Sequence, residues 1–284
     1  MEQNIKNDLN ISEVEMIEAL KRSGYLLESE ISKVLAEAGF SIETNQIIED
    51  PITGKGREID LMAEFNSLYN EERSRLKVAS KVRFIFEIKN NLFPIVLLTK
   101  YRFTPNIEDW IGLKEAVTLP NDIKYEWFES FYDELIKNRS EGIYTQYCSF
   151  HKKKANDELM ALHPDNIHDG LLNITLHCEE MVKIFDTSLL YEKTDTAKKD
   201  DYFRHFIYLP ILLLNDNLYE LIDDKLTKVD SSILIFNYFF NKEPKMAYIF
   251  VLTKKGFPAF MNKMINLENR TEQKMYEARK EIEG

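Results

Sequence analysis

The stretch of sequence that decides the fold reads Val82-Arg83-Phe84-Ile85-Phe86-Glu87-Ile88-Lys89. It is mainly apolar until its end, where an acid and an amine stand in alternate positions. Because successive side chains of a strand point to opposite faces, Glu87 and Lys89 share one face and the phenylalanines share the other. The sequence therefore predicts a strand with one face in the core that presents a carboxylate beside an ammonium group at its end.

A second strand-like stretch reads Arg57-Glu58-Ile59-Asp60-Leu61-Met62-Ala63 and places another acid in an apolar run. Residues 40–49, which precede it, roughly alternate apolar and polar side chains, and the turn Gly54-Lys55-Gly56 lies between the two segments. Alternation interrupted by glycine is typical of a β-hairpin. We therefore expect a hairpin whose second strand carries Asp60.

Two helices are expected before this hairpin. Ser12 followed by Glu15 is the pattern of a capping box and predicts a short helix over 12–21. In the next segment apolar residues recur at helical spacing, and Gly39 suits the position just after a helix end, where glycine is favoured. Glu28 lies at the edge of that apolar face. The apolar residues are Leu27, Ile31, Val34, Leu35 and Ala38.

The rest of the chain alternates strand-like and helix-like segments. Residues 66–81 are polar and predict an exposed excursion or helix, whereas 192–201 predict a linker or a loop. Apolar runs indicate strands, and amphipathic segments indicate helices. The apolar runs are 91–99, 143–150, 207–214, 233–240 and 246–253, and the expected helices are 126–137, 168–185 and 258–281.

This order of elements indicates an α/β protein built on a mixed β-sheet flanked by helices. We expect an N-terminal helix within 1–22, a core over 23–190 and a C-terminal α/β extension over 191–284. The sequence leaves open whether the extension is a separate unit or part of the same compact domain.

Composition narrows the class of protein. With 284 residues, 44% of them hydrophobic and 30% charged, the chain can bury a full core. Cys148 and Cys178 match no zinc spacing, and no apolar run reaches the roughly 20 residues of a membrane span, so we expect a cytoplasmic protein without membrane contact. The net charge of -11 opposes non-specific binding to nucleic acid. Any such role must depend on local patches.

In combination, a helix that carries an acid, a strand with Ile-Asp and a strand with Glu-x-Lys resemble the PD-(D/E)XK nuclease superfamily. This superfamily includes type II restriction enzymes and archaeal Holliday junction resolvases. The resemblance covers residues 24–90, with Ile59 where the name of the motif has proline. In resolvase-like members the helix acid lies eleven residues before a glycine of a Gly-Phe or Gly-Tyr pair, as Glu28 does before Gly39.

The resemblance implies a restriction-endonuclease-like core and a metal-dependent endonuclease. Asp60, Glu87 and the backbone carbonyl of Ile88 would hold Mg²⁺ or Mn²⁺, since these ions take oxygen ligands. Glu28, with Glu30 as a substitute, would act through a metal-bound water or a second ion. Lys89 would position the attacking water or, with a lowered pKa, help to deprotonate it.

The implied substrate is nucleic acid, DNA rather than RNA, with restriction, anti-phage defence or DNA repair as context. The implied partners are a second copy of the chain, in a homodimer, and a partner protein in a defence system. Two alternatives stay open, because fold alone does not settle activity. One is an inactive nuclease-like module that binds or regulates. The other is a plain α/β interaction protein, in which Glu28 would lie far from Asp60.

Two further groups of residues could carry chemistry. Lys152, Lys153 and Lys154 directly follow an expected strand and either contact phosphates or form an ordinary solvated strand end. A set of histidines and aspartates could suggest a second metal site, but helix capping and exposed helix positions account for it better. The set is His163, Asp165, His168, Asp169 and His177.

Overall fold

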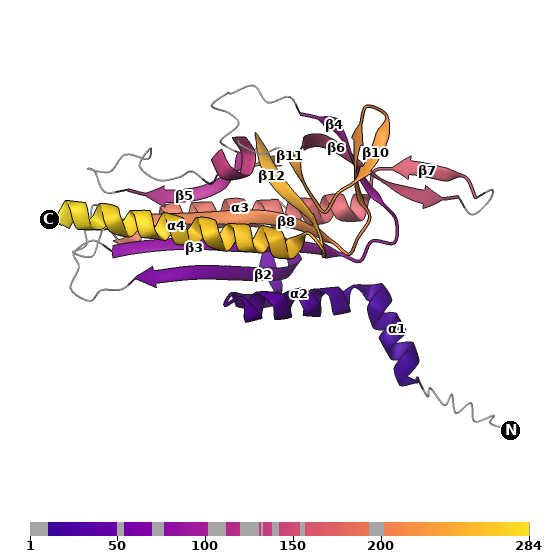
Figure 1. Cartoon of the computed structure of the whole chain (residues 1–284), viewed down its shortest axis with the longest axis horizontal. Coiled ribbons are helices and arrows are strands. Elements are labelled where there is room, and N and C mark those ends of the chain that lie inside the picture. Colours follow the sequence, from indigo (N-terminus) through magenta and orange to yellow (C-terminus); the bar gives the residue numbers. More distant parts are fainter. Residues whose placement is uncertain are drawn as a thin grey trace.

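The structure is a computed structural model, and its described part forms a mixed sheet of twelve strands flanked by helices (Figure 1). The predicted α/β class with a mixed sheet and flanking helices is therefore confirmed. The residues that the structure describes are 11–49, 54–69, 77–101, 112–119, 131, 133–137, 142–153, 157–192 and 202–283.

The first helix, α1 (Glu13–Ser23), begins with the predicted capping box. The backbone N–H of Glu15 donates to the Ser12 hydroxyl at 3.2 Å, and the backbone N–H of Ser12 donates to the Glu15 carboxylate at 2.9 Å. This reciprocal pair satisfies two donors that a helix start leaves open. No side chain of α1 is buried, so packing contributes little to this helix.

The second helix, α2 (Tyr25–Glu37), has Ala38 as its C-cap and Gly39 just after it, in the predicted position. The N–H of Phe40 donates to the carbonyl of Leu35 at 3.1 Å, and the N–H of Gly39 donates to that of Ala36 at 3.0 Å. These two bonds form a Schellman motif, which requires a left-handed residue, and Gly39 has a φ of 89°. Leu27, Ile31 and Leu35 are the buried residues of the helix.

Replacing Gly39 by alanine should therefore lower the free energy of unfolding by about 1 kcal/mol. No atom lies within 4 Å of the added Cβ, so backbone strain is the whole cause. Gly39→Asn should cost less, because asparagine tolerates this conformation. Urea denaturation of both variants checks the prediction, which fails if alanine costs no more than asparagine.

The strands and the remaining helices have the following bounds. The strands are β1 (Ser41–Glu49), β2 (Gly56–Tyr69), β3 (Lys77–Lys89), β4 (Ile95–Lys100), β5 (Lys114–Thr118), β6 (Ile143–Lys152), β7 (Leu159–Leu162), β8 (Tyr202–Leu214), β9 (Leu218–Ile222), β10 (Lys225–Lys228), β11 (Ser231–Phe240) and β12 (Glu243–Thr253). The helices are α3 (Asp165–Glu192), α4 (Phe257–Glu283) and a π-helical turn at Asp133–Lys137. The strand order is β1-β2-β3-β8-β12-β11-β6-β4-β9-β10, with β5 beside β8 and β7 beside β6.

Most of the predicted elements are confirmed, including the hairpin β1–β2 and the strands β6, β8, β11 and β12. The prediction of an exposed excursion or helix over 66–81 is wrong at both ends of this range. Asn66 pairs with Lys81 and Tyr69 with Val78, so β2 and β3 simply continue. β3 also pairs with β8 over its whole length, so this extension is part of the sheet. Residues 70–76, half of the helix expected over 126–137 and most of the linker expected over 192–201 lie outside the described residues.

The central strand of this arrangement is β8. It runs parallel to β3 along its full length, and its other edge is shared: β5 pairs with it as far as Tyr208, and β12 pairs with it from Ile211. Pro210 lies between these two partners, where its missing N–H removes no ladder bond on that edge. Strands from before and after residue 191 thus alternate within one sheet.

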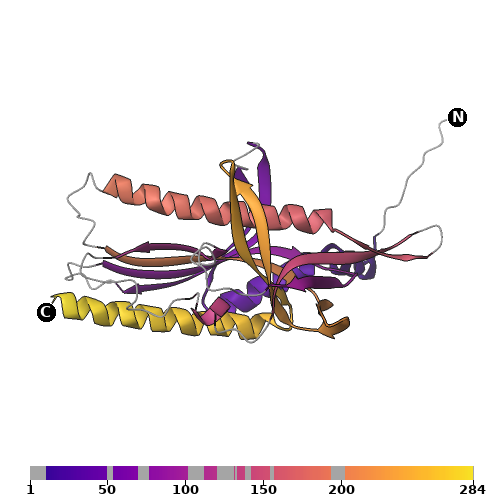
Figure 2. The same ribbon diagram turned by 90° about the horizontal axis from the view of Figure 1, so that it is seen from above.

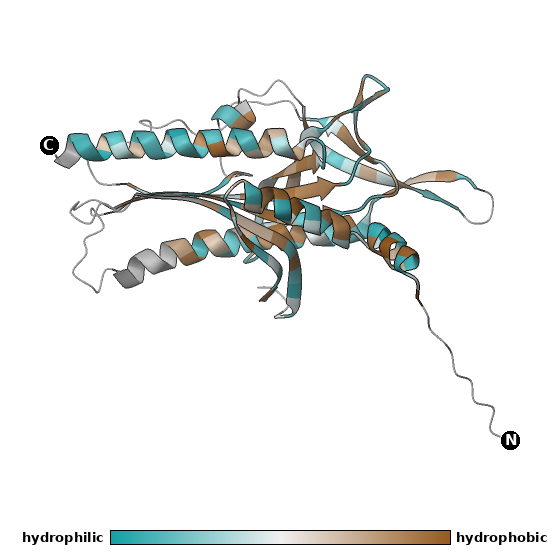
Figure 3. Cartoon of the chain, turned by 60° about the horizontal axis from the view of Figure 1, so that its bottom comes forward, coloured by the Kyte–Doolittle hydropathy of each residue, from teal (hydrophilic) through white to brown (hydrophobic). Residues whose placement is uncertain are grey.

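Helices cover both faces of the sheet, with α3 on one side and α4 on the other (Figure 2). Side chains of α2 and α4 form one core cluster with Phe84 and Phe86, and side chains of α3 form a second cluster with Ile85. The predicted alternation of β3 is thereby confirmed. The strands between the helices are hydrophobic, whereas the later part of α4 is largely hydrophilic (Figure 3).

Candidate active site

The candidate acids and the lysine come from three elements that meet near the end of β3. Asp60 lies on β2, which is the antiparallel neighbour of β3, with Leu61 opposite Phe86. The Asp60 carboxylate accepts a hydrogen bond of 2.7 Å from the backbone N–H of Ile88. This bond fixes Asp60 beside the residue that separates Glu87 from Lys89.

Glu87 is buried between the sheet and α3. It is 5% exposed and forms an ion pair with Lys89. Its carboxylate lies directly against Gly170 of α3, where an added Cβ would be 2.1 Å from the carboxylate carbon. A glycine in the middle of a helix is unfavourable by itself, and here it makes room for the acid. The sequence analysis missed Gly170, although an isolated glycine in an amphipathic helix is a signal of close packing.

The charges of these residues act on one another. The pKa of Glu87 is raised to about 7, mainly by burial and then by the charges of Asp60 and Glu28, against the lowering effect of Lys89. Burial also raises the pKa of Asp60 and of Glu28, and each of these two interacts with Lys89. The structure therefore brings Glu28, Asp60, Glu87 and Lys89 into one electrostatic group. Glu28 and Asp60 are thus close enough for their charges to interact, whereas the alternative of a plain interaction protein predicts that they lie far apart.

Lys89 stays charged in this group. Burial by itself would lower its pKa, but Glu87, Asp60 and Glu28 together raise the pKa above its ordinary value. The lowered pKa that would suit a general base is not found. The chemistry open to Lys89 is thus that of a fixed cation, which positions a water molecule or steadies negative charge.

Contacts with β3 and with the turn after β12 hold the ends of α1 and α2 and show which acid of α2 belongs to the site. The side-chain amide of Asn90, next to Lys89, donates to the carbonyl oxygens of Lys21 and Arg22 at the end of α1. Glu30 forms an ion pair with Lys254, which leaves Glu28 as the acid of α2 that joins the group. The preference for Glu28 over Glu30 agrees with these contacts.

A divalent cation fits the chemistry of this group. The charges of three carboxylates act on one lysine, and carboxylates whose pKa is raised by burial are stabilised in their charged form by a nearby cation. Among the described residues, no three His, Cys, Asp or Glu side chains stand close enough to chelate an ion by themselves. The expected set needs only two carboxylates, those of Asp60 and Glu87, together with the carbonyl of Ile88.

The other candidate residues stay apart from this group. Lys152 and Lys153 are exposed on the β6–β7 hairpin, which projects from the body of the protein (Figure 1), and Lys153 pairs with Glu158 at 3.0 Å. Lys154 lies outside the described residues. His163 approaches Asp165 at 3.8 Å and His168 approaches the Tyr147 hydroxyl at 3.3 Å, without a metal-binding cluster in the described part of the chain.

We found no protein-family model, no curated protein and no solved structure that matches this chain. The likeness to a known superfamily therefore rests on the residues named above and on their placement. In the part of the chain that the structure describes, the helices are too short or too polar to cross a membrane.

Proposed function

We propose that this protein is a divalent-metal-dependent endonuclease with a restriction-endonuclease-like core. The observation that carries the proposal is the meeting of Glu28, Asp60, Glu87 and Lys89 from α2, β2 and β3. A helix followed by an antiparallel hairpin and a third strand, with the charged residues where the strands come together, is the arrangement that the motif requires. All four residues are ionisable, Glu87 is buried and the other three are half-buried, which is expensive for a scaffold that needs no chemistry.

Each residue has a role that follows from its contacts. Asp60 and Glu87, with the carbonyl of Ile88, would hold Mg²⁺ or Mn²⁺; when bound, the ion neutralises charge on the phosphoryl oxygens and acidifies a water molecule. Asp60 is held for this by the N–H of Ile88. Lys89, kept charged by its acidic neighbours, positions the attacking water and stabilises negative charge that develops on the phosphate. Glu28 accepts a hydrogen bond from a water at the edge of the site.

The substrate that we propose is DNA, on the grounds of the motif pattern. A homodimer would allow two such sites to cut both strands of a duplex, and a partner protein would place the enzyme in a defence system. We also propose a cytoplasmic location. If the assay below finds no cleavage, the protein is a nuclease-like binding or regulatory module instead.

The test compares wild-type protein with Asp60→Asn, which keeps the shape of the side chain and its hydrogen bond while removing the charge. Both are incubated with plasmid, single-stranded DNA and RNA in Mg²⁺, in Mn²⁺ or in chelator. Wild type should cut at least one substrate only when metal is present, and the variant should not. Glu43→Gln, at an exposed position of β1, is the matched control and should behave as wild type. Equal behaviour of wild type and Asp60→Asn on every substrate would remove the enzymatic claim.

A further inference from the structure

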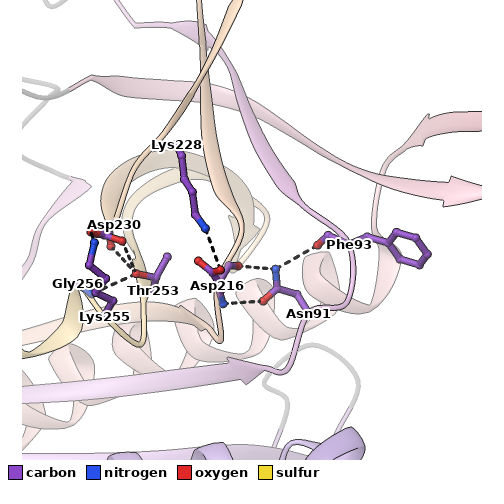
Figure 4. A network of polar contacts seen from close by, with 8 residues as sticks. All are labelled: Asn91, Phe93, Asp216, Lys228, Asp230, Thr253, Lys255 and Gly256. Carbon is purple, nitrogen blue, oxygen red and sulfur yellow. Dashed lines mark hydrogen bonds and ion pairs between the residues drawn. The ribbon is translucent and has the colours of Figure 1, made fainter.

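A cavity of about 700 Å³ opens beside the candidate site, at the edge of the sheet where three parallel strands end. It lies between the turn that follows β8, the end of β10 and the turn that follows β12 (Figure 4). Its lining includes Lys228, Lys254 and Lys255, together with Asp216 and Asp230. The sequence analysis did not single out any of these residues.

Backbone hydrogen bonds connect this cavity to the end of β3. The N–H of Asn215 donates to the carbonyl of Lys89 at 3.1 Å, and the N–H of Lys254 donates to the carbonyl of Leu214 at 2.8 Å. The ends of β3, β8 and β12 are therefore in register at one edge. Since neighbouring strands lie about 4.8 Å apart, the turn at Lys254 is about 10 Å from the end of β3. This distance is short enough for one strand of nucleic acid to reach both places.

The three lysines are held by carboxylates that a phosphate group can replace. Lys228 pairs with Asp216 at 2.9 Å and Lys255 pairs with Asp230 at 2.7 Å, while Lys254 pairs with Glu30 of α2. The lysine side chains are 47%, 82% and 45% exposed, in the order Lys228, Lys255 and Lys254. Such exposed pairs are weak, and lysines that neutralise phosphates gain affinity by releasing counterions. The lining itself holds three lysines and two acids, and Glu30 of α2 supplies the third acid.

The turns that carry these lysines are fixed rather than loose. The side-chain amide of Asn91 donates to the carbonyl of Asp216 at 2.7 Å. The N–H of Gly256 donates to the Thr253 hydroxyl at 3.1 Å, and a Cβ at Gly256 would lie 2.1 Å from the carbonyl oxygen of Asp230 (Figure 4). The backbone around the cavity is thus preorganised, and only the lysine side chains need to move when an anion binds.

We propose that this cavity binds phosphate groups of the nucleic-acid strand beside the bond that is cut. The inference rests on the proposed function and deepens it, because it assigns Lys228, Lys254 and Lys255 to the substrate. Lys254 exchanges Glu30 for a phosphate when the strand binds. Glu30 and Glu28 lie on the same helix. Binding in the cavity, which releases Glu30 from Lys254, therefore acts on the helix that carries Glu28 into the site.

The test measures binding of a labelled single-stranded DNA 12-mer by fluorescence anisotropy over a range of NaCl concentrations. The full chain carries Asp60→Asn throughout, so that the DNA stays intact. With Lys228→Gln, Lys254→Gln and Lys255→Gln combined, affinity should fall at least tenfold. The slope of log affinity against log salt should become shallower by about 2, at about 0.7 for each lost phosphate contact.

A control with the same change in net charge separates local contacts from long-range attraction. It combines Lys33→Gln, Lys183→Gln and Lys263→Gln, which remove three other exposed lysines that each have a polar partner. This control should keep the slope of the parent. Lys255→Gln alone, at the most exposed of the three positions, should lower the slope by about 0.7 without a loss of folding.

Three outcomes overturn the inference. If the two triple variants lose the same slope, the cavity has no special part in binding, while metal-dependent cleavage by wild type would still support the proposed function. If inorganic phosphate or a mononucleotide binds as tightly as the 12-mer, the cavity serves a free anion and not a strand. If the parent binds no nucleic acid and wild type cuts none, the proposed function and this inference fail together.

Discussion

Replacing Gly170 by alanine is expected to lower the free energy of unfolding by about 2 kcal/mol and to slow cleavage by about 100-fold. The added methyl group would stand 2.1 Å from the carboxylate carbon of Glu87 and 2.3 Å from one of its oxygens. Glu87 is buried, so its carboxylate has to turn away from Gly170 or α3 has to move, and overpacking of this kind costs about 1–3 kcal/mol. A displacement of about 1 Å at a reacting group is enough to reduce catalysis by about two orders of magnitude.

A double-mutant cycle with Glu87→Ala isolates this contact. In the Glu87→Ala background the methyl group of Gly170→Ala has room, and the better helix propensity of alanine should make the change neutral or stabilising by up to about 1 kcal/mol. Urea denaturation gives the stability part of the cycle even if the protein is not a nuclease. If alanine at position 170 costs the same in both backgrounds, the contact with Glu87 is not the cause. A normal cleavage rate in Gly170→Ala would show that Glu87 need not hold its present position.

Local signals in the sequence account for the elements that were predicted well. The capping box at Ser12, the glycine after α2 and the alternation before Glu87 are each decided by residues only a few positions apart. The grouping of Asp60 with Glu87 follows from one antiparallel pairing of neighbouring strands. Glu28 joins them because the short connection from α2 into β1 leaves the helix beside that hairpin.

Long-range packing accounts for what was missed. Gly170 meets Glu87 only because α3, far along the chain, covers the face of β3 that carries the acid. The extension of β2 and β3 past Asn66 and before Val82 depends on β8, which the sequence does not assign to β3. The hairpin β9–β10 does have a local signal in the sequence, which is the pair Asp223-Asp224 at its turn. Asp223 and Asp224 both have positive φ, as a two-residue turn between strands requires.

The second large effect concerns Glu268, a buried acid on α4 far along the chain from the candidate site. The residue is 0% exposed, and both of its carboxylate oxygens lack a hydrogen-bond partner. Its pKa is raised to about 7, mainly by burial and also by the charge of Glu272, against the lowering effects of Ser80 of β3 and His205 of β8. The acid therefore keeps its proton in the folded protein under conditions in which the unfolded chain has already lost it.

The sign of the pH dependence follows from this difference. Between a pH of about 4.5 and about 7, the folded state binds the proton of Glu268 and the unfolded state does not, so the free energy of unfolding falls as pH rises. At about 1.4 kcal/mol for each pKa unit, the loss over this window is about 3 kcal/mol, and it is complete above pH 7. Glutamine resembles the protonated acid but cannot ionise. Glu268→Gln should therefore lack this loss.

Urea denaturation of wild type and Glu268→Gln at pH 5, 6, 7 and 8 measures the difference directly. The stability of the variant relative to wild type should rise by about 3 kcal/mol from the acid to the alkaline end. Other groups cancel in this comparison, including Glu87, whose pKa is also raised to about 7. Glu277→Gln, at an exposed position of the same helix, should leave the pH curve of wild type unchanged. Parallel curves for wild type and Glu268→Gln would mean that Glu268 is ionised in the folded protein, which its burial without a hydrogen-bond partner makes unfavourable.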